Sequence, residues 1–285
     1  MKTKSNRIED IIEYIYKELK NKYQDNEIKS FVNILFEHFA QLNSAHIMAF
    51  PQETINESSL LEIVLATQEL KKHKPIQQII GKVDFLNISL EVNENVLIPR
   101  PETEELCQTI IQENQEKNLD IMDLCSGSGC ISLSLAKNIA QSKIVGVDIS
   151  TEALSVARRN NEVLGLDVEY IEANILEDFN VDKEFDIIVS NPPYVMNKEK
   201  EQMEKNVLDY EPHLALFVED ENPLIFYKAI EKFAKNHLRS SGKIYLEINE
   251  SLAKETIALF SSEEYSYQIV KDLFQKDRFI FLQKK

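Results

Sequence analysis

The feature that most constrains this 285-residue chain is a regular alternation of strand-like and helix-like segments after Asn118. Short runs rich in Ile, Val and Tyr alternate with longer stretches whose apolar residues recur every three or four positions. The predicted strands cover residues 121–124, 143–148, 168–172, 186–190, 243–248, 265–270 and 278–282, and the predicted helices cover 130–140, 151–164, 223–237 and 252–260. This pattern is typical of an α/β domain with a doubly wound parallel sheet.

The end of the chain departs from a purely parallel arrangement. Only residues 271–277 separate the last two predicted strands, so these strands should pair antiparallel at one edge. We therefore expect a mostly parallel, Rossmann-like sheet of seven strands, built by residues 100–285.

The first part of the chain has a different pattern. Apolar residues recur at helical spacing in three stretches, at about 8–19, 28–50 and 60–70, and Pro51 ends the second. Residues 1–75 are therefore predicted to form a small all-helical domain. Residues 76–99 contain β-type residues around short polar turns, which predicts a hairpin-like connector. The two prolines of Pro99-Arg-Pro101 then favour the start of a helix.

Charge is unevenly distributed along the sequence. The net charge is −16, yet residues 1–75 carry 10 Lys or Arg against 11 Asp or Glu, and the remainder carries 22 against 37. An acidic surface repels the phosphates on which nucleic-acid affinity depends, and it favours a basic protein partner. The alternative is that the acidity only serves solubility.

Other compositional features point to a cytoplasmic protein. No apolar run approaches the roughly 20 residues of a membrane span, and the N-terminal residues lack the apolar segment of a secretory signal. The three cysteines, Cys107, Cys125 and Cys130, have neither disulfide-framework nor zinc-site spacing, so buried reduced thiols are expected.

A glycine-rich turn follows the first predicted strand, in the segment Ile121-Met-Asp-Leu-Cys-Ser-Gly-Ser-Gly-Cys130. Gly127 and Gly129 allow backbone N–H groups to approach a ligand closely, and the start of the next helix favours an anionic group. The candidate cofactor-binding residues here are Asp123, Cys125, Ser126, Gly127, Ser128 and Gly129. A turn of this kind alone is also compatible with a tight connection that binds nothing.

Polar residues also follow the second and third predicted strands. Asp148 lies about 25 residues after Asp123, near the position where nucleotide-binding sheets carry an acid for the ribose hydroxyls. Its alternative role is a helix N-cap. Asn174 is placed either to bind an adenine edge or to stabilise a turn. Together these residues predict an adenosine-containing cofactor, without separating NAD from S-adenosylmethionine.

The end of the fourth predicted strand favours S-adenosylmethionine. There, Asn191-Pro-Pro-Tyr194 stands at the carboxyl end of a buried strand, where open α/β sheets hold ligands. Because the prolines fix φ, the Asn191 side chain and the Pro192 carbonyl form two fixed acceptors for the two N–H groups of a planar NH2. Tyr194 offers an aromatic wall, and Pro193 completes the candidate substrate site. The alternative is that the prolines only end a strand.

Three of these motifs together resemble those of a known enzyme class. The turn, Asp148 and Asn191–Tyr194 resemble the class I amino-methyltransferases. Within that class, Val96–Glu104 (Val-Leu-Ile-Pro-Arg-Pro-Glu-Thr-Glu) is similar to the peptide chain release factor N5-glutamine methyltransferases, the PrmC/HemK family. The segments 211–212, 214–216 and 222–224 resemble the same family. Cys125 stands where that family often has a glycine.

The resemblance implies S-adenosylmethionine as the methyl donor and, as the acceptor, the glutamine of the Gly-Gly-Gln motif in translation release factors. It also implies that the helical domain docks this protein partner. We expect a monomer, with no metal, no membrane and no nucleic-acid substrate.

Three other functions remain as alternatives: a nucleic-acid methyltransferase acting on the exocyclic amine of adenine, a ribosomal-protein glutamine methyltransferase, and a cofactor-binding scaffold without catalysis. The acidic balance argues against the first, and the resemblance of Pro99–Glu104 argues against the second. Asn191, Pro192 and Tyr194 together argue against the third.

Overall fold

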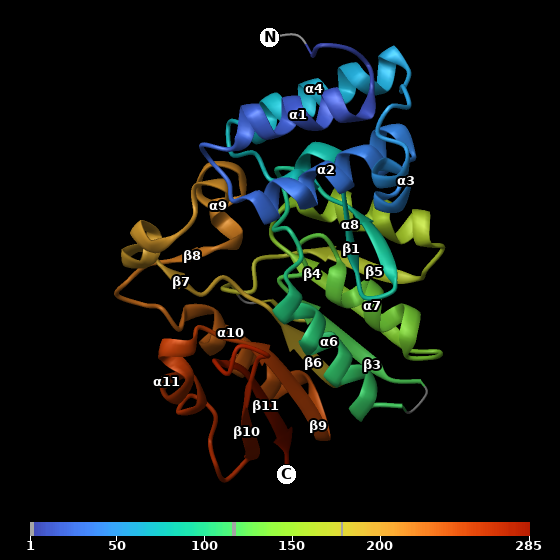
Figure 1. Ribbon diagram of the computed structural model, residues 1–285. Helices are drawn as coiled ribbons and strands as arrows, with labels where there is room; N and C mark the ends of the chain where they lie inside the picture. The colour runs from blue at the N-terminus through green and yellow to red at the C-terminus, as the bar shows by residue number, and fades with distance from the viewer. Residues whose placement is uncertain (1–2, 116–117, 178) are drawn as a thin grey trace. The chain divides into compact units, whose positions relative to one another are not determined.

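The computed structural model describes residues 3–115, 118–177 and 179–285 (Figure 1). Its internal contacts divide the chain into two compact units. One unit comprises Met1–Gly81 with Glu204–Tyr210, and the other comprises Lys82–Met203 with Glu211–Lys285. In the part of the chain that the structure describes, no helix is long and apolar enough to cross a membrane.

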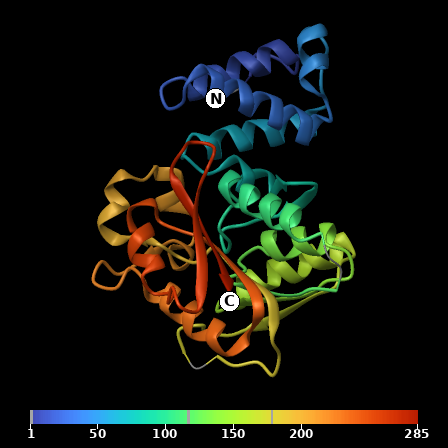
Figure 2. The same ribbon diagram turned by 90° about the horizontal axis from the view of Figure 1, so that it is seen from below.

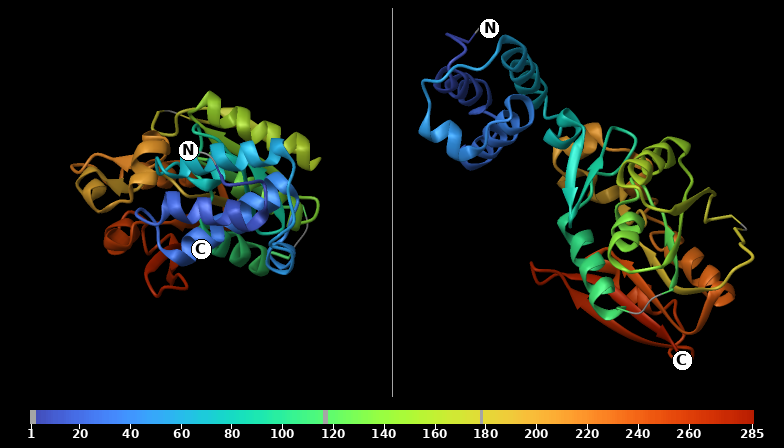
Figure 3. Two further views of the ribbon diagram at one scale, coloured as in Figure 1. Left: turned by 45° about the horizontal axis from the view of Figure 1, so that its top comes forward. Right: turned by 90° about the vertical axis from the view of Figure 1, so that its right-hand side faces the viewer.

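The smaller unit is a helical bundle, whose N-terminal helices are blue to cyan in Figure 3. Its helices are α1 (Ile8–Leu19), α2 (Asp25–Ala40), α3 (Ser44–Ala49), α4 (Glu57–Leu70), α5 (Ile76–Ile80) and α9 (Lys205–Tyr210). The apolar stripes predicted from sequence form its core, in which Ile11, Leu35 and Ile63 are completely buried.

The second helical stretch of the sequence is two helices instead of one. Gln41 adopts a left-handed conformation that ends α2, and the Asn43 side chain accepts a hydrogen bond from the His46 N–H to begin α3. Helix α9 is distant in sequence but belongs to this unit. The Tyr210 hydroxyl donates to the Lys72 carbonyl, and Gln78 donates to the Tyr210 carbonyl.

The larger unit begins with an antiparallel hairpin of β1 (Lys82–Phe85) and β2 (Ile88–Glu91). The Asn160 side chain fixes this hairpin to α8 (Thr151–Leu164), because it exchanges hydrogen bonds with both backbone groups of Glu91.

A seven-stranded sheet forms the centre of this unit, in the order β10-β11-β9-β6-β3-β4-β5. Its strands are β3 (Asp120–Leu124), β4 (Lys143–Asp148), β5 (Val168–Glu172), β6 (Phe185–Ser190), β9 (Leu238–Glu247), β10 (Tyr265–Lys271) and β11 (Asp277–Lys284). Neighbours from β9 to β5 are parallel, whereas β11 pairs antiparallel with both β9 and β10. Figure 2 shows this final hairpin in red. The predicted fold class and antiparallel edge are confirmed.

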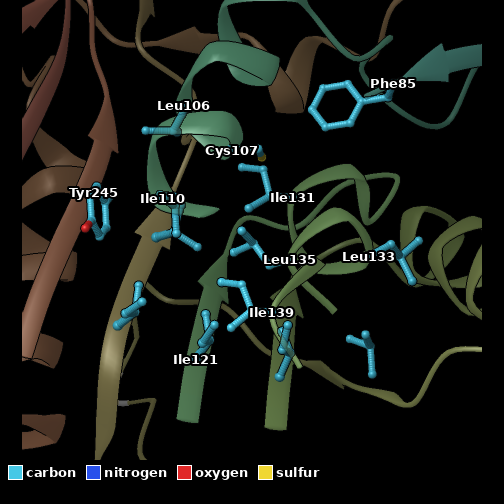
Figure 4. Close-up of a cluster of buried hydrophobic side chains, with 14 of the residues drawn as sticks. Phe85, Leu106, Cys107, Ile110, Ile121, Ile131, Leu133, Leu135, Ile139 and Tyr245 are labelled. Carbon is cyan, nitrogen blue, oxygen red and sulfur yellow. The ribbon is translucent and has the colours of Figure 1, made fainter. Parts of the chain in front are cut away.

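Helices cover both faces of the sheet. On one face, α6 (Pro101–Glu113), α7 (Cys130–Asn138) and α8 pack on side chains such as Ile121 (Figure 4). On the other face, α10 (Ile225–His237) and α11 (Ala253–Ile257) pack on side chains such as Met122. Successive residues of β3 thus enter opposite cores, as expected for a strand buried on both sides.

The remaining elements are short and follow the carboxyl ends of β6 and β9. Strands β7 (Val195–Met196) and β8 (Phe217–Val218) pair in parallel. The 3₁₀ turns are Asn197–Gln202, His213–Ala215 and Glu250–Leu252. The loop elements between β6 and α10 were not predicted, because two-residue strands and single turns carry no periodic signal.

Candidate active site

A cavity lies at the carboxyl ends of the central parallel strands. It is lined by residues that follow β3, β4, β5 and β6 and also by Asn95–Leu97, Pro99, Arg100 and Thr103, and its volume is about 1100 Å³ when the solvent-open part is included. The chain runs from β3 outward to β5 and then returns to β6 on the other side of β3. Such a reversal of strand order is the place where doubly wound sheets bind their ligands.

The turn after β3 has an unusual backbone. Cys125, Gly127 and Gly129 have φ angles of 64°, 56° and 80°. This left-handed region suits glycine and costs another residue about 1 kcal/mol. Glycine at position 125 would therefore be free of a strain that Cys125 carries. Asp123 stabilises the turn, because its Oδ2 accepts from the Ser126 hydroxyl and from the Ser132 N–H.

Gly129 serves packing in this structure. A Cβ atom at this position would lie 2.5 Å from the Tyr170 hydroxyl and 3.2 Å from Ala157 Cβ. At Gly127, by contrast, a Cβ atom would meet nothing within 4 Å. The close approach of the turn to β5 therefore requires Gly129, whereas Gly127 lines the cavity.

Asp148, at the end of β4, fixes the opposite wall of the cavity. Its Oδ2 accepts from the Gly127 N–H at 2.8 Å, and its Oδ1 accepts from the Ser150 N–H at 2.9 Å. Burial raises the pKa of this carboxyl group, and the hydrogen bonds from Ser150 and Gly127 lower it. The N-cap of α8 is Ser150, whose hydroxyl accepts from the Ala153 N–H. The Ile149 N–H also lowers the pKa of Asp148 by a hydrogen bond, and the carboxylate retains acceptor capacity for a ligand.

Asn174 also lines the cavity, and it stabilises a turn. Its Oδ1 accepts from the Leu176 N–H, and its Nδ2 donates to Glu177. Both roles considered from the sequence therefore remain compatible with its position. Ile149, Ile175 and Leu176 lie beside it along the cavity wall and supply apolar surface.

Asn191 follows β6 and lines the cavity together with Pro193. Its Nδ2 donates to Thr103 Oγ1 at 3.0 Å, and Thr103 Oγ1 donates to Glu247 Oε2 at 2.8 Å. In the part of the chain that the structure describes, Asn191 Oδ1 has no hydrogen-bond partner. A free acceptor oxygen at the cavity wall is suited to a donor N–H group on a ligand.

Tyr194 and Glu247 extend these hydrogen bonds beyond the residues that line the cavity. The Tyr194 hydroxyl donates to Glu247 Oε1 at 3.0 Å, and burial raises the pKa of Tyr194 well above its usual range. Burial also raises the pKa of Glu247, to about 6, although hydrogen bonds from Thr103 and Tyr194 and the nearby charge of Arg278 lower it. Arg278 pairs with the fully buried Asp272.

The predicted site residues separate into two groups. Among the described residues, those that line the cavity are Cys125, Ser126, Gly127, Ser128, Asp148, Asn174, Asn191 and Pro193. Asp123, Gly129, Pro192 and Tyr194 are not among the described lining residues. Asp123 and Gly129 support the turn, and Tyr194 packs against the core formed with α10 and α11.

Sequence reasoning missed Thr103 and Glu247 as members of the site. Glu247 did carry a signal, because it is an acid inside the otherwise apolar segment Ile244–Ile248. A buried acid without a partner is costly, so its place in this strand indicates hydrogen bonds from elsewhere in the fold. Thr103 gave a weaker signal, since a threonine in a first helical turn is common.

Comparisons with known proteins agree with this geometry. Residues 102–210 match the methyltransferase small domain family. A release factor glutamine methyltransferase of Flavobacterium psychrophilum is 45% identical over 90% of this chain and 92% of its own length. That of Bacteroides thetaiotaomicron is 38% identical over 95% of this chain and 98% of its own.

A solved structure supports the fold independently. The crystal structure of a methyltransferase from Pyrococcus furiosus matches with a TM-score of 0.54 at 17% identity, covering 79% of this chain and 96% of that one. At this low identity the likeness concerns the fold alone.

Proposed function

The chain belongs to the family of release factor glutamine methyltransferases, and we propose that it transfers a methyl group from S-adenosylmethionine to the side-chain amide nitrogen (N5) of a release factor glutamine. The acceptor is the glutamine of the Gly-Gly-Gln motif. The observation that carries this proposal is the free Oδ1 of Asn191 at the wall of the cavity.

The residues present fit S-adenosylmethionine. Asp148 has spare acceptor capacity for ribose hydroxyls, and Ile149 and Ile175 offer apolar surface to a flat base. Gly127 leaves open space where a side chain would otherwise project. When bound, S-adenosylmethionine supplies a methyl group that is already activated on a positively charged sulfur.

The protein then contributes placement of the nitrogen. An amide nitrogen is a weak nucleophile, because its lone pair is delocalised into the carbonyl group. Asn191 Oδ1 is the acceptor at the cavity wall that orients the substrate NH2. The Pro192 carbonyl, which is not among the described lining groups, is the second acceptor that the motif predicts. Orientation can supply roughly 7–11 kcal/mol. As the nitrogen gains positive character, both acceptors bind its N–H groups more strongly, so they stabilise the transition state more than the ground state. The methylated nitrogen then loses one proton to solvent.

We also propose that the helical unit docks the release factor. Leu61 and Leu65, one turn apart on α4, have exposed fractions of 58% and 57%. Met48 and Phe50, at the end of α3, are similarly exposed. Apolar side chains left in water on a small helical unit favour a protein contact.

A labelled-methyl assay tests the function. The protein is incubated with labelled S-adenosylmethionine and, separately, with a bacterial release factor, the same factor carrying alanine in place of the Gly-Gly-Gln glutamine, a ribosomal protein fraction, and DNA. We expect label only on the unaltered release factor, and mass spectrometry should assign one methyl group to that glutamine. Label on DNA or on ribosomal protein, or equal label on the alanine variant, would contradict the proposal.

A further inference from the structure

A relay of hydrogen bonds connects Asn191 to a buried carboxyl group. Asn191 Nδ2 donates to Thr103 Oγ1 at 3.0 Å, and Thr103 Oγ1 donates to Glu247 Oε2 at 2.8 Å. Thr103 and Glu247 are 2% and 1% exposed, so water does not compete for these groups. The three residues come from the loop after β6, the first turn of α6 and the last position of β9.

The chemistry of these groups gives the relay one direction. An ionised carboxylate only accepts hydrogen bonds, so the single hydroxyl proton of Thr103 points to Glu247. The hydroxyl oxygen must then accept from Asn191, and only the Nδ2 side of that amide can donate. The amide rotated by 180° would face Thr103 with a second acceptor, which would leave the Asn191–Thr103 contact without a proton. Buried polar groups left unpaired in this way cost about 1–3 kcal/mol.

We propose that Thr103 and Glu247 are positioning residues that fix the orientation of the Asn191 amide, so that its Oδ1 faces the substrate. The inference rests on the proposed function and extends it, because it explains how the site distinguishes an NH2 group from an acceptor group of the same shape. A glutamate carboxylate, for example, offers Asn191 Oδ1 no proton. Glu247 is not among the described residues that line the cavity, so it acts through Thr103.

The protonation of Glu247 is set by groups from several elements. Thr103 and Tyr194 face it by side-chain hydrogen bonds, and Tyr227 donates to its backbone carbonyl. Arg278 and Glu102 act on it by charge. The thiols of Cys107 and Cys130 also face it, but burial raises their pKa, so they are neutral. Burial dominates and raises the pKa of Glu247 to about 6. A protonated Glu247 can itself donate to Thr103. The Thr103 hydroxyl can then donate to Asn191, so the contact no longer requires Asn191 Nδ2 to face Thr103.

Substitution of Thr103 provides the first test. Thr103→Val keeps the side-chain shape and removes the hydroxyl, so we expect kcat on the release factor to fall about 10–100-fold, by analogy with the loss of a residue that orients a metal ligand. Cofactor affinity, measured by calorimetry, should stay within about threefold. Thr103→Ser should return most of the turnover. The control is Thr256→Val, which removes another fully buried helical hydroxyl, one that bonds the Leu252 carbonyl, and should keep wild-type kcat.

The pH profile provides a readout that a packing role would not produce. Wild-type kcat should fall as the pH drops through about 6, when Glu247 takes up a proton. Thr103→Val should lack this acid limb, because the relay is already broken. Glu247→Gln, whose amide can donate to Thr103, should have low kcat at every pH between 5 and 8.

The outcomes separate this inference from the proposed function. If the wild-type protein does not methylate the release factor, the proposed function fails. If the wild type is active and Thr103→Val has wild-type kcat with an unchanged acid limb, the orientation inference alone is overturned. Loss of cofactor affinity in Thr103→Val together with Thr103→Ser would also overturn it, because Thr103 would then be a cofactor ligand.

Discussion

Asn191 is the residue on which the proposed chemistry depends most directly. Asn191→Ala removes one of the two acceptors for the substrate NH2, and we expect kcat to fall about 10²–10³-fold, as for the loss of one preorganised polar contact. Asn191 is partly buried at the cavity wall, and cofactor binding should largely survive its truncation. Steady-state kinetics on the release factor combined with calorimetry of cofactor binding would measure both effects. Near-normal turnover would exclude the proposed role of Asn191.

Asp148 should show the opposite pattern. Its two oxygens hold the Gly127 and Ser150 N–H groups and have capacity left for ribose hydroxyls. Hydrogen bonds to a charged group contribute about 1.5–3 kcal/mol, so Asp148→Ala should weaken cofactor binding at least 10-fold. Asp148→Asn retains one acceptor oxygen, so its cofactor affinity in calorimetry should lie between those of wild type and Asp148→Ala. An unchanged affinity in Asp148→Ala would remove this carboxylate from the cofactor site.

At the scale of elements, the turn between β3 and α7 depends on its contact with β5. Gly129→Ala should destabilise the protein more than Gly127→Ala does, by about 1–3 kcal/mol, because both carry the strain of a positive φ but only the former meets Tyr170. Urea denaturation measures the difference between the two variants.

Tyr170→Phe provides the matched background for this comparison. It removes the hydroxyl oxygen that a Cβ atom at Gly129 would approach to 2.5 Å. In that background, the two alanine substitutions should have more similar effects. A Gly129→Ala cost that is unchanged by Tyr170→Phe would show that contact with the Tyr170 hydroxyl does not explain the glycine.

Elements with a strong local pattern were predicted closely from sequence. Strands β4 and β5 and helix α8 have the predicted bounds, because each is a single periodic run between turn residues. Strand β9 begins at Leu238 and not at the predicted Lys243. Its first residues are held by distant groups: the Arg239 side chain bridges Asp120 and Asp186. Periodicity within one segment contains no information about such partners.

The same limit applies to the candidate site. The polar residues after β3, β4, β5 and β6 were predicted because parallel strands bring their carboxyl ends to one edge, and most of these residues do line one cavity. The bond between Thr103 and Glu247 joins residues 144 positions apart. Glu247 is conspicuous as an acid in an apolar segment, but the sequence does not show that Thr103 is its partner, so only the folded chain reveals the relay.

At the scale of the whole molecule, the proposed docking role of the helical unit predicts a separation of kinetic effects. Replacing both Leu61 and Leu65 by Glu should raise KM for the release factor about 10-fold or more, which corresponds to 1.4 kcal/mol of binding energy. Both kcat and cofactor affinity should stay unchanged, because neither residue lines the described cavity. The control Val163→Glu alters a side chain in α8 of the other unit that is 66% exposed, and it should leave KM unchanged. Equal KM values in the double variant and the control would contradict docking through α4.

The stability of the molecule should depend on pH through its buried acids. Asp123 is completely buried, and burial raises its pKa to about 7 against the lowering effect of hydrogen bonds from Ser126 and Ser132. In the unfolded chain the pKa of an aspartate is about 3.9, so between these values the folded protein holds a proton that the unfolded chain has lost. The free energy of unfolding therefore decreases as the pH rises from about 4 to about 7, by about 1.4 kcal/mol per pH unit for one such group.

Asp123→Asn isolates this effect, because an asparagine does not titrate. Urea denaturation at pH 5, 6, 7 and 8 compares the variant with wild type. The unfolding free energy of the variant minus that of wild type should increase up to about pH 7 and then level off. Any constant cost of the new amide adds equally at every pH and cancels in this comparison. Glu247→Gln should give the same trend with its plateau near pH 6. If the difference in unfolding free energy between Asp123→Asn and wild type is constant from pH 5 to 8, Asp123 is ionised throughout this range. The turn that lines the cofactor cavity would then be stabilised by a buried negative charge.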